Sequence, residues 1–211
     1  MANWSVVQYL YWIVAVSLGS GIVMNIGPSI SARLTQPTQQ TMDWVGKPSQ
    51  PEGARPAHPW HGASFPLEQF TAYTSAFGYR QHPMGGTRFH YGLDLAAPMG
   101  SYIRSWWDGK ITRIASDRAC GTHLIIQSGD WVHIYCHMLG EIVLEQGGDR
   151  VMVDRPAGME IRQGQWIKAG QRIGRVGMSG SATGPHLHWG LRYQGAWIDP
   201  AIVIKAMYDS Q

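Results

Sequence analysis

The chain of 211 residues is long enough for one domain or two small ones, and 44% of its residues are hydrophobic, enough to build a core. Charged residues make up only 15% of it, against roughly 25% in an ordinary soluble domain, which excludes a coiled coil, an ion-paired helical bundle and a disordered acidic tail. The net charge of +3 comes without a basic run, so nucleic acid is not expected as a partner.

The first 32 residues carry no charged side chain, and residues 6–24 are apolar except for Gln8, Ser17 and Ser20. As a helix, this stretch would be about 28 Å long, close to the roughly 30 Å of a bilayer core. A buried core helix and a cleaved signal peptide are the alternatives, although a signal peptide would need a basic first segment that is absent here. We expect residues 1–32 to form a membrane anchor or signal segment, with the rest of the chain outside the cytoplasm.

Residues 33–69 hold six of the 12 prolines, with Gln, Ser and Thr between them. Such a composition cannot bury enough apolar surface to fold alone, which predicts a flexible linker. His58 and His61 lie in this segment, but Pro59 prevents a helix from aligning them on one metal ion, so we expect surface histidines.

From residue 70 to residue 211, short apolar runs alternate with Gly-rich turns, which is typical of a mainly β domain. Ser128-Gly129-Asp130 predicts a hairpin turn between two strands. A short helix is expected from about Pro200 to Met207, with proline in its first turn. The clearest strand candidates are residues 109–112, 123–126 and 131–135.

Nine histidines stand against 14 acidic residues, and His is both the commonest metal ligand and a side chain that titrates near neutral pH. His90 and Asp94 are four residues apart in a strand-like context, so their side chains would share a face, as would those of His186 and His188. A catalytic zinc ion takes three protein ligands and leaves one position for water, so one of these four would remain for proton transfer. Each motif alone is frequent by chance.

The neighbouring motifs make the combination specific. Phe77-Gly-Tyr-Arg80, followed by His82-Pro, precedes the first pair; Tyr135-Cys-His137 comes next; and Gly180-x-x-Thr183-Gly-Pro leads into the second pair. In this order they resemble the LytM/lysostaphin-type zinc metallopeptidases of family M23, which cleave peptidoglycan. The resemblance covers about residues 70–200. It implies a mainly antiparallel β domain with an open groove, related to barrel-sandwich folds.

The resemblance also implies roles for individual residues. His90, Asp94 and His188 match the family's ligands of one Zn²⁺ ion, and His137 and His186 match its catalytic pair. Zinc would lower the pKa of a bound water and polarise the scissile carbonyl. One of the two histidines would take the proton from water and the other would support the developing oxyanion, without a separate assignment of the two roles.

Three further residues are candidates for substrate contact. Arg80 could bind a substrate carboxylate through two hydrogen bonds, or it could form a structural salt bridge. His133 and Tyr135 would lie on the same face of a strand as His137, which would place them along the groove.

Two features depart from the common family pattern. Residues 140–160 form a longer link than usual, expected as a hairpin or loop on the rim of the groove that tunes substrate choice or contacts a partner protein. Cys120 and Cys136 would lie close across the two strands joined near Gly129, so a disulfide is expected outside the cytoplasm, the alternative being two reduced buried thiols. Cys136 is expected to point away from His137, which argues against a cysteine ligand for zinc.

Three functions from different classes match parts of this sequence. The first is a zinc endopeptidase of the cell envelope, membrane-anchored or secreted, that cuts peptide stems or cross-links of bacterial peptidoglycan. The second is a non-catalytic relative that activates cell-wall amidases; such relatives usually lack a metal ligand, and this chain has all three. The third is a biotinyl or lipoyl carrier module around Lys168, which lacks the methionines that usually flank the modified lysine. We therefore expect the enzyme, with the regulator as the alternative.

Overall fold

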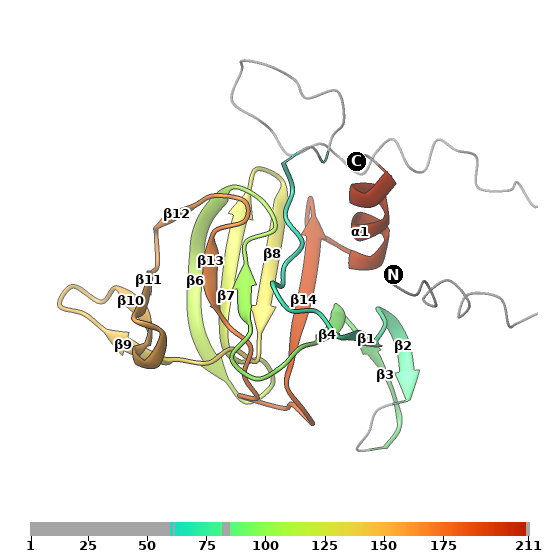
Figure 1. The fold of residues 1–211 in the computed structure, drawn as a ribbon, viewed down its shortest axis with the longest axis horizontal. Coiled ribbons are helices and arrows are strands. Elements are labelled where there is room, and N and C mark those ends of the chain that lie inside the picture. The colour runs from blue at the N-terminus through green and yellow to red at the C-terminus, as the bar shows by residue number, and fades with distance from the viewer. Residues whose placement is uncertain (1–59, 61, 82–84, 210–211) are drawn as a thin grey trace, which may run out of the picture. The chain divides into compact units, whose positions relative to one another are not determined.

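The computed structural model describes residue 60, residues 62–81 and residues 85–209, and within these the chain is mainly antiparallel β-structure (Figure 1). The expected mainly β fold is confirmed. The expected N-terminal helix in residues 1–32, together with His58, His61 and His82, lies outside the described residues. Among the residues described, no helix is long and apolar enough to cross a membrane.

An eight-stranded sheet forms the body of the domain, and each of its strand pairs is antiparallel. Strand β14 lies between β4 and β8, so that His188 pairs with Asp94 on one side and with Cys136 on the other. This register brings His188 next to residues that lie 94 and 52 positions earlier in the chain. In pairing order, the strands are β1 (Ala72–Ser75), β4 (Leu93–Ala96), β14 (His186–Tyr193), β8 (Trp131–Cys136), β7 (Gly121–Ser128), β6 (Gly109–Asp117) and β12 (Trp166–Ile167), with β15 (Ala196–Ile198) paired to β14.

Smaller elements surround this sheet. The expected hairpin turn is confirmed, because Ser128 pairs with Trp131 around Gly129. The expected C-terminal helix is also confirmed: it begins at Pro200, and Asp199 accepts a hydrogen bond from the Ala201 N–H at 2.9 Å. These elements are β2 (Gly78–Gln81) paired with β3 (Thr87–His90), β5 (Tyr102–Arg104) paired with β13 (Arg172–Arg175), a sheet of β9 (Glu141–Leu144), β10 (Arg150–Asp154) and β11 (Met159–Arg162), the 3₁₀ turn η2 (Arg155–Ala157), and α1 (Pro200–Asp209).

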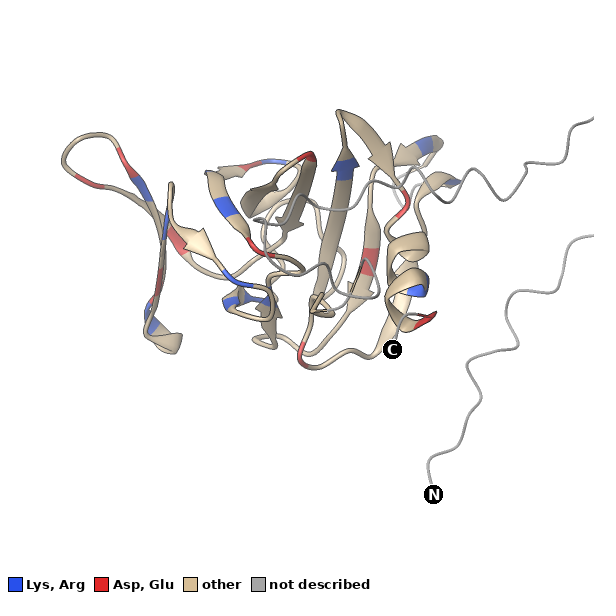
Figure 2. Cartoon of the chain, turned by 90° about the horizontal axis from the view of Figure 1, so that it is seen from above, with Lys and Arg blue, Asp and Glu red and all other residues tan. Residues whose placement is uncertain are grey.

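The long segment 140–160 contains the expected hairpin, formed by β9 and β10, and β11 extends it to a three-stranded sheet. In Figure 2, residues coloured as charged are frequent along this small sheet and fewer along the large sheet. Asp154 is buried and forms two hydrogen bonds with the Arg175 guanidinium of β13, at 2.6 and 2.7 Å, which fastens the small sheet to the rest of the domain.

The predicted linker extends too far along the chain. Trp60 is buried and packs against Trp106 at a ring-centroid distance of 5.2 Å, and Leu67 is buried beside Ile103. Glu68 binds two arginines, one in β5 and one in β13. Composition suggested a linker up to residue 69 because prolines are frequent there, but the apolar residues between them complete the core of the domain.

His133 and Tyr135, expected to contact substrate, are completely buried instead. The Tyr135 hydroxyl accepts a hydrogen bond from the Trp106 N–H at 2.9 Å, and the His133 ring lies against the Trp106 indole at 4.9 Å. The shared face of β8 therefore packs into the core, and direct substrate contact by these two residues was a wrong expectation.

Burial of His133 predicts a specific sensitivity to acid. Burial lowers its pKa from 6.5 to about 3, so between these values the unfolded chain binds a proton that the folded chain does not. The stability that neutral His133 contributes is therefore present above pH 6.5 and is lost as the pH falls toward 3.

In His133→Phe, we expect the free energy of unfolding to fall less steeply from about pH 6 to pH 4, by about 1.4 kcal/mol per pH unit. Urea unfolding across this range measures the slope. His133→Gln, which also cannot take up the proton, should match His133→Phe, and a slope equal to that of the unchanged protein would refute the prediction.

Candidate metal and catalytic site

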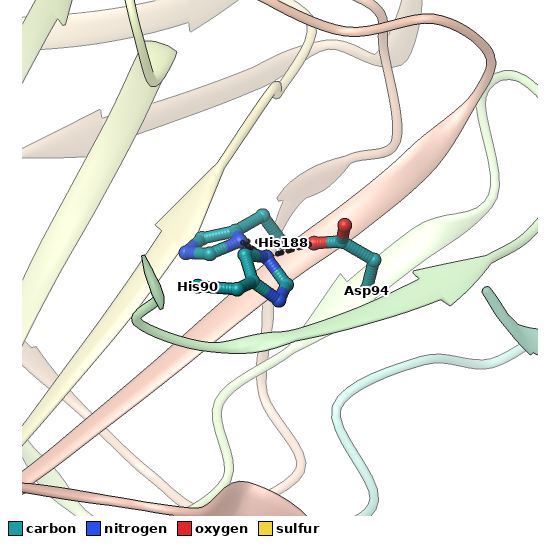
Figure 3. A group of neighbouring side chains, drawn as sticks. All are labelled: His90, Asp94 and His188. Atoms are coloured by element: carbon teal, nitrogen blue, oxygen red, sulfur yellow. Dashed lines mark hydrogen bonds and ion pairs between the residues drawn. The ribbon is translucent and has the colours of Figure 1, made fainter. Parts of the chain in front are cut away.

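Three side chains from separate elements converge on one point: His90 at the end of β3, Asp94 in β4 and His188 in β14 (Figure 3). The distance from His90 Nε2 to His188 Nδ1 is 2.9 Å, that from His90 Nε2 to Asp94 Oδ1 is 3.0 Å, and that from His188 Nδ1 to Asp94 Oδ1 is 2.9 Å. The three donor atoms thus form a nearly equilateral triangle.

This triangle fits a zinc ion. Donor atoms around tetrahedral zinc, with bonds of about 2.0–2.2 Å, lie about 3.3 Å apart, slightly wider than the triangle observed. Burial would raise the pKa of Asp94, but the close interaction of its carboxylate with the His188 and His90 rings outweighs burial and holds that pKa well below the usual range. Burial lowers the pKa of His188 against the opposing effect of Asp94. A carboxylate and neutral imidazoles are the forms that bind metal.

A backbone carbonyl orients the His90 ring as a metal ligand would need. Its Nδ1–H donates a hydrogen bond to the Ala76 carbonyl at 2.8 Å, which leaves the Nε2 lone pair facing Asp94 and His188. Metal-binding histidines commonly have such a partner on the second ring nitrogen, because it fixes both the tautomer and the orientation of the ring.

His90 and Asp94 meet in a different way from the one predicted. They do not share a strand: β3 ends at His90, and β4 begins at Leu93 after a turn. Gly92 in this turn lies so close to β14 that a Cβ there would be 2.6 Å from His188 Cε1. The turn therefore brings the two side chains together and leaves room for His188. His186 and His188 do share one face of β14, as predicted.

His137 and His186 face one another beside the triangle, with ring centroids 4.6 Å apart. His137 Nδ1–H donates to the Ser179 carbonyl at 2.8 Å, and His186 Nδ1–H donates to the Gly184 carbonyl at 2.8 Å. Both Nε2 atoms are therefore left with a lone pair that can accept a proton. Burial lowers the pKa of His137 to about 4, so this imidazole is neutral at pH 7.

A pocket of about 340 Å³ is lined by the three residues of the triangle together with His137 and His186. Arg80 also lines it, with a guanidinium nitrogen 3.8 Å from Asp94 Oδ2. No residue of 140–160 lines it, so the expected place of that segment on the groove rim is not observed. Cys136 lines the pocket together with His137, against the expectation that it points away, because strand β8 and its alternation end at Cys136.

The expected disulfide is present and joins Cys120 to Cys136. Sequence reasoning missed the carbonyl groups that orient the histidines, those of Ala76, Ser179 and Gly184. Backbone groups leave no signal in residue identity. The glycine-rich segment 177–184 was a hint, since a Cβ at Gly177 would lie 2.8 Å from the His137 carbonyl oxygen and one at Gly180 would lie 2.3 Å from the Gly121 nitrogen.

Comparison with known proteins places these residues in a family. The profile of peptidase family M23 matches residues 88–200, slightly more than half of the chain. The DD-carboxypeptidase/endopeptidase Mpg of Neisseria meningitidis is 34% identical over 136 residues, which cover 64% of this chain and 27% of that protein. The peptidoglycan DD-endopeptidase ShyB of Vibrio cholerae is 30% identical over 129 residues, covering 59% of this chain and 26% of ShyB. The matched region thus spans about a quarter of these relatives.

Solved structures agree with this placement. A putative M23 peptidase from Pseudomonas aeruginosa has a TM-score of 0.52 and 27% identity, over 76% of this chain and 54% of that one. A zinc-containing peptidase from Vibrio cholerae has a TM-score of 0.50 and 28% identity, over 68% of this chain and 38% of that one. The strand register that assembles the His-Asp-His triangle and the matched profile lead to one conclusion: this chain belongs to peptidase family M23.

Proposed function

We propose that this protein is a zinc-dependent endopeptidase that hydrolyses peptide bonds in the stems or cross-links of bacterial peptidoglycan. The observation that carries the proposal is the convergence of three donor atoms, 2.9–3.0 Å apart, beside two imidazoles whose Nδ1–H groups are bound to backbone carbonyls. The substrate class is supported by the relatives, since ShyB is named a peptidoglycan DD-endopeptidase.

In this proposal, His90, Asp94 and His188 hold the zinc ion. Bound zinc would supply Lewis-acid chemistry, acidifying water and polarising the scissile carbonyl. His137 and His186 would handle the protons: both Nδ1–H groups are committed to backbone carbonyls, so Nε2 of either ring can accept the proton of the attacking water. The ring that has taken this proton becomes a donor, and it can then stabilise the developing oxyanion or protonate the leaving amine.

Cleavage of purified peptidoglycan tests this function. The protein is incubated with peptidoglycan with and without a chelator, zinc is then restored, and new amino termini are identified. We expect new termini that disappear on chelation and return with zinc. Cleavage that persists without metal would refute the proposed mechanism. Absence of cleavage combined with stimulation of a cell-wall amidase would favour the regulator, although the complete set of five side chains in one pocket supports the enzyme.

We further propose that the protein works outside the cytoplasm, with residues 1–32 as a membrane anchor or signal segment, a shortened linker and then the peptidase domain. The disulfide supports this compartment, because such bonds persist mainly in oxidising surroundings. Separating cytoplasm, membrane and soluble envelope fractions locates the protein, and recovery from the cytoplasm would contradict the proposal.

We propose that Arg80 binds a substrate carboxylate. Its guanidinium lines the pocket on the Asp94 side and is 29% exposed, so it remains accessible to a ligand. In Arg80→Gln, we expect KM for a peptide with a free carboxylate near the scissile bond to rise about tenfold, with kcat and zinc affinity little changed. A peptide amidated at that carboxylate is the matched control and should lose its dependence on Arg80. Reduced zinc affinity with unchanged KM would instead assign Arg80 to a structural salt bridge with Asp94.

A further inference from the structure

We propose that the Cys120–Cys136 disulfide positions the catalytic imidazole of His137, so that turnover depends on this bond while zinc binding does not. The inference rests on the proposed function, in which His137 takes part in proton transfer. It assigns the disulfide a place in the reaction itself, in addition to whatever it contributes to folding.

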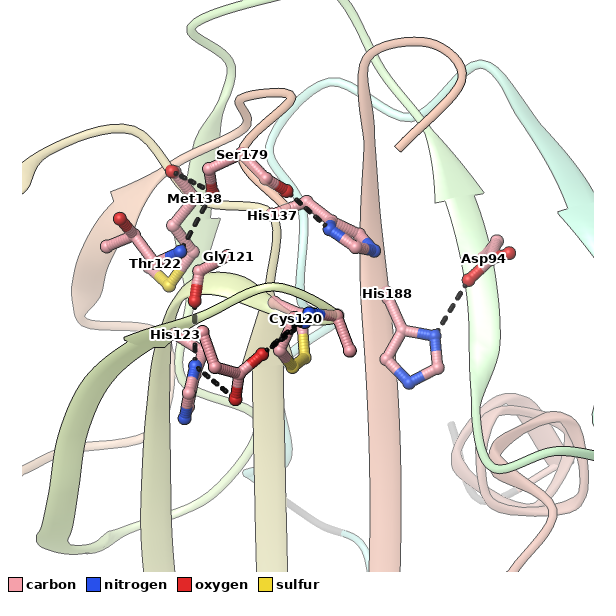
Figure 4. The surroundings of a disulfide bond; sticks show 12 residues. Asp94, Cys120, Gly121, Thr122, His123, His137, Met138, Ser179 and His188 are labelled. Atoms are coloured by element: carbon pink, nitrogen blue, oxygen red, sulfur yellow. Dashed lines mark hydrogen bonds and ion pairs between the residues drawn. A yellow bond between two sulfur atoms is a disulfide. The ribbon is translucent and has the colours of Figure 1, made fainter. Parts of the chain in front are cut away.

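The disulfide holds the backbone of His137 from two sides. Cys136 is the last residue of β8 and directly precedes His137, and its Cα lies 4.9 Å from that of Cys120 in the turn between β6 and β7 (Figure 4). The His137 N–H donates a hydrogen bond to the carbonyl of the same Cys120 at 2.8 Å. One covalent bond and one hydrogen bond therefore tie the start of His137 to a single turn, residues 118–121.

The same turn supports the group that orients the His137 ring. The Ser179 carbonyl accepts the Nδ1–H of His137, and Ser179 Oγ accepts the N–H of Thr122 at 2.9 Å (Figure 4). The N–H of Ser181 donates to the Ala119 carbonyl at 3.0 Å. Both the backbone and the ring of His137 are thus held, directly or through Ser179, by the segment that contains Cys120.

His137 needs such support because its backbone is unusual. Its φ of 62° lies in the left-handed region, which residues other than glycine rarely adopt without surrounding constraint. The β8 ladder to β14 ends at the pair of Cys136 with His188, so strand pairing with β14 does not extend to His137. The contacts with the 118–121 turn and with Ser179 take over at this point.

The triangle of metal-binding residues is held in another way. His90 is fixed by the Ala76 carbonyl, and Asp94 and His188 by pairing between β4 and β14. His188 also pairs with Cys136 in the β8–β14 ladder, but that pairing is made by main-chain groups and not by the disulfide, and none of these supports passes through the 118–121 turn. Loss of the disulfide should therefore separate two properties that a general loss of folding would reduce together.

The test is a double-mutant cycle in the full-length protein. We expect the pair Cys120→Ala and Cys136→Ala to keep zinc stoichiometry and KM but to lose about tenfold to a hundredfold in kcat, since small misplacement of a catalytic group has such effects. In a His137→Ala background, the same pair should cause no further loss of kcat. Equal losses of kcat in both backgrounds, or no loss in either, would overturn the proposal.

Two controls separate positioning from stability. Val203→Ala opens a gap in the buried face of α1, far along the chain, and should lower Tm without changing kcat. If the cysteine variant does not fold, the folded protein is reduced with a water-soluble phosphine, which is oxidised to the phosphine oxide as water supplies the oxygen and two thiols form. We expect kcat to fall in the reduced protein while circular dichroism remains unchanged, and unchanged kcat would contradict the proposal.

A readout independent of activity distinguishes this inference from the proposed function. NMR signals of the His137 ring, assigned with His137→Ala, should shift or broaden when the disulfide is removed, while those of His90 stay in place. If the unchanged protein cleaves no peptide, the proposed function fails and the ring signals still decide whether the disulfide positions His137. Unaltered His137 signals would overturn the positioning role.

Discussion

His188→Ala is expected to lose zinc binding, and with it peptide hydrolysis, at zinc concentrations that saturate the unchanged protein. His188 Nδ1 lies within 2.9 Å of both other donor atoms, so its removal leaves only His90 and Asp94 to hold the ion. Loss of a group that merely supports a metal ligand costs about 10- to 100-fold in affinity, and loss of the ligand itself should exceed this. Zinc competition against a chromophoric chelator measures affinity, and release of new amino termini from peptidoglycan measures activity.

His133→Gln is the matched control for this variant. It also removes an imidazole from a strand next to β14, but one that is buried in the core outside the pocket. It should keep both zinc and activity. Full hydrolysis of the wall by His188→Ala, or by protein freed of zinc, would refute the proposed mechanism.

His186→Ala is expected to lose activity while largely keeping zinc. Its ring is oriented by the Gly184 carbonyl and faces His137, and its Nε2 is 3.8 Å from Asp94 Oδ1, outside the triangle of donor atoms. Loss of a positioned acid or base lowers rates by about 10²- to 10⁴-fold, and we expect kcat to fall in this range. The same assays as for His188→Ala apply. A variant that loses zinc in proportion to activity would make His186 a ligand, and one that keeps kcat would remove it from the reaction.

Comparing the two variants separates zinc binding, proposed for His188, from proton transfer, proposed for His186. His188→Ala should fail in both assays, whereas His186→Ala should fail in only one. Added zinc at high concentration should therefore rescue His188→Ala partly and leave His186→Ala unchanged.

The secondary structure was largely predictable because it depends on local pattern. Short apolar runs and glycine turns indicated the strands, and Pro200 marked the start of the helix. Composition was less reliable for the domain boundary. The prolines before residue 69 suggested a linker, but Trp60 and Leu67 are core residues, and this follows only from contacts with distant parts of the chain.

The site was predictable in its residues and less so in its geometry. Strand alternation correctly placed His186 and His188 on one face, since both lie within β14. The same rule failed for His90 and Asp94, where a turn intervenes, and for Cys136 and His137, where the strand has ended. It also misplaced His133, because alternation says which residues share a face but not whether that face meets solvent or the core.

The carbonyl groups behind three of the site histidines have a consequence for how such a protein can diverge. Ala76, Ser179 and Gly184 accept the Nδ1–H groups through their main chain, and a carbonyl group is present whichever side chain stands there. Substitutions at these positions can therefore leave the protonation pattern of the site intact as long as the backbone path is kept. The rim of the pocket is free to change its side chains, and with them its preference among peptides, while the reactive nitrogens continue to face the same way.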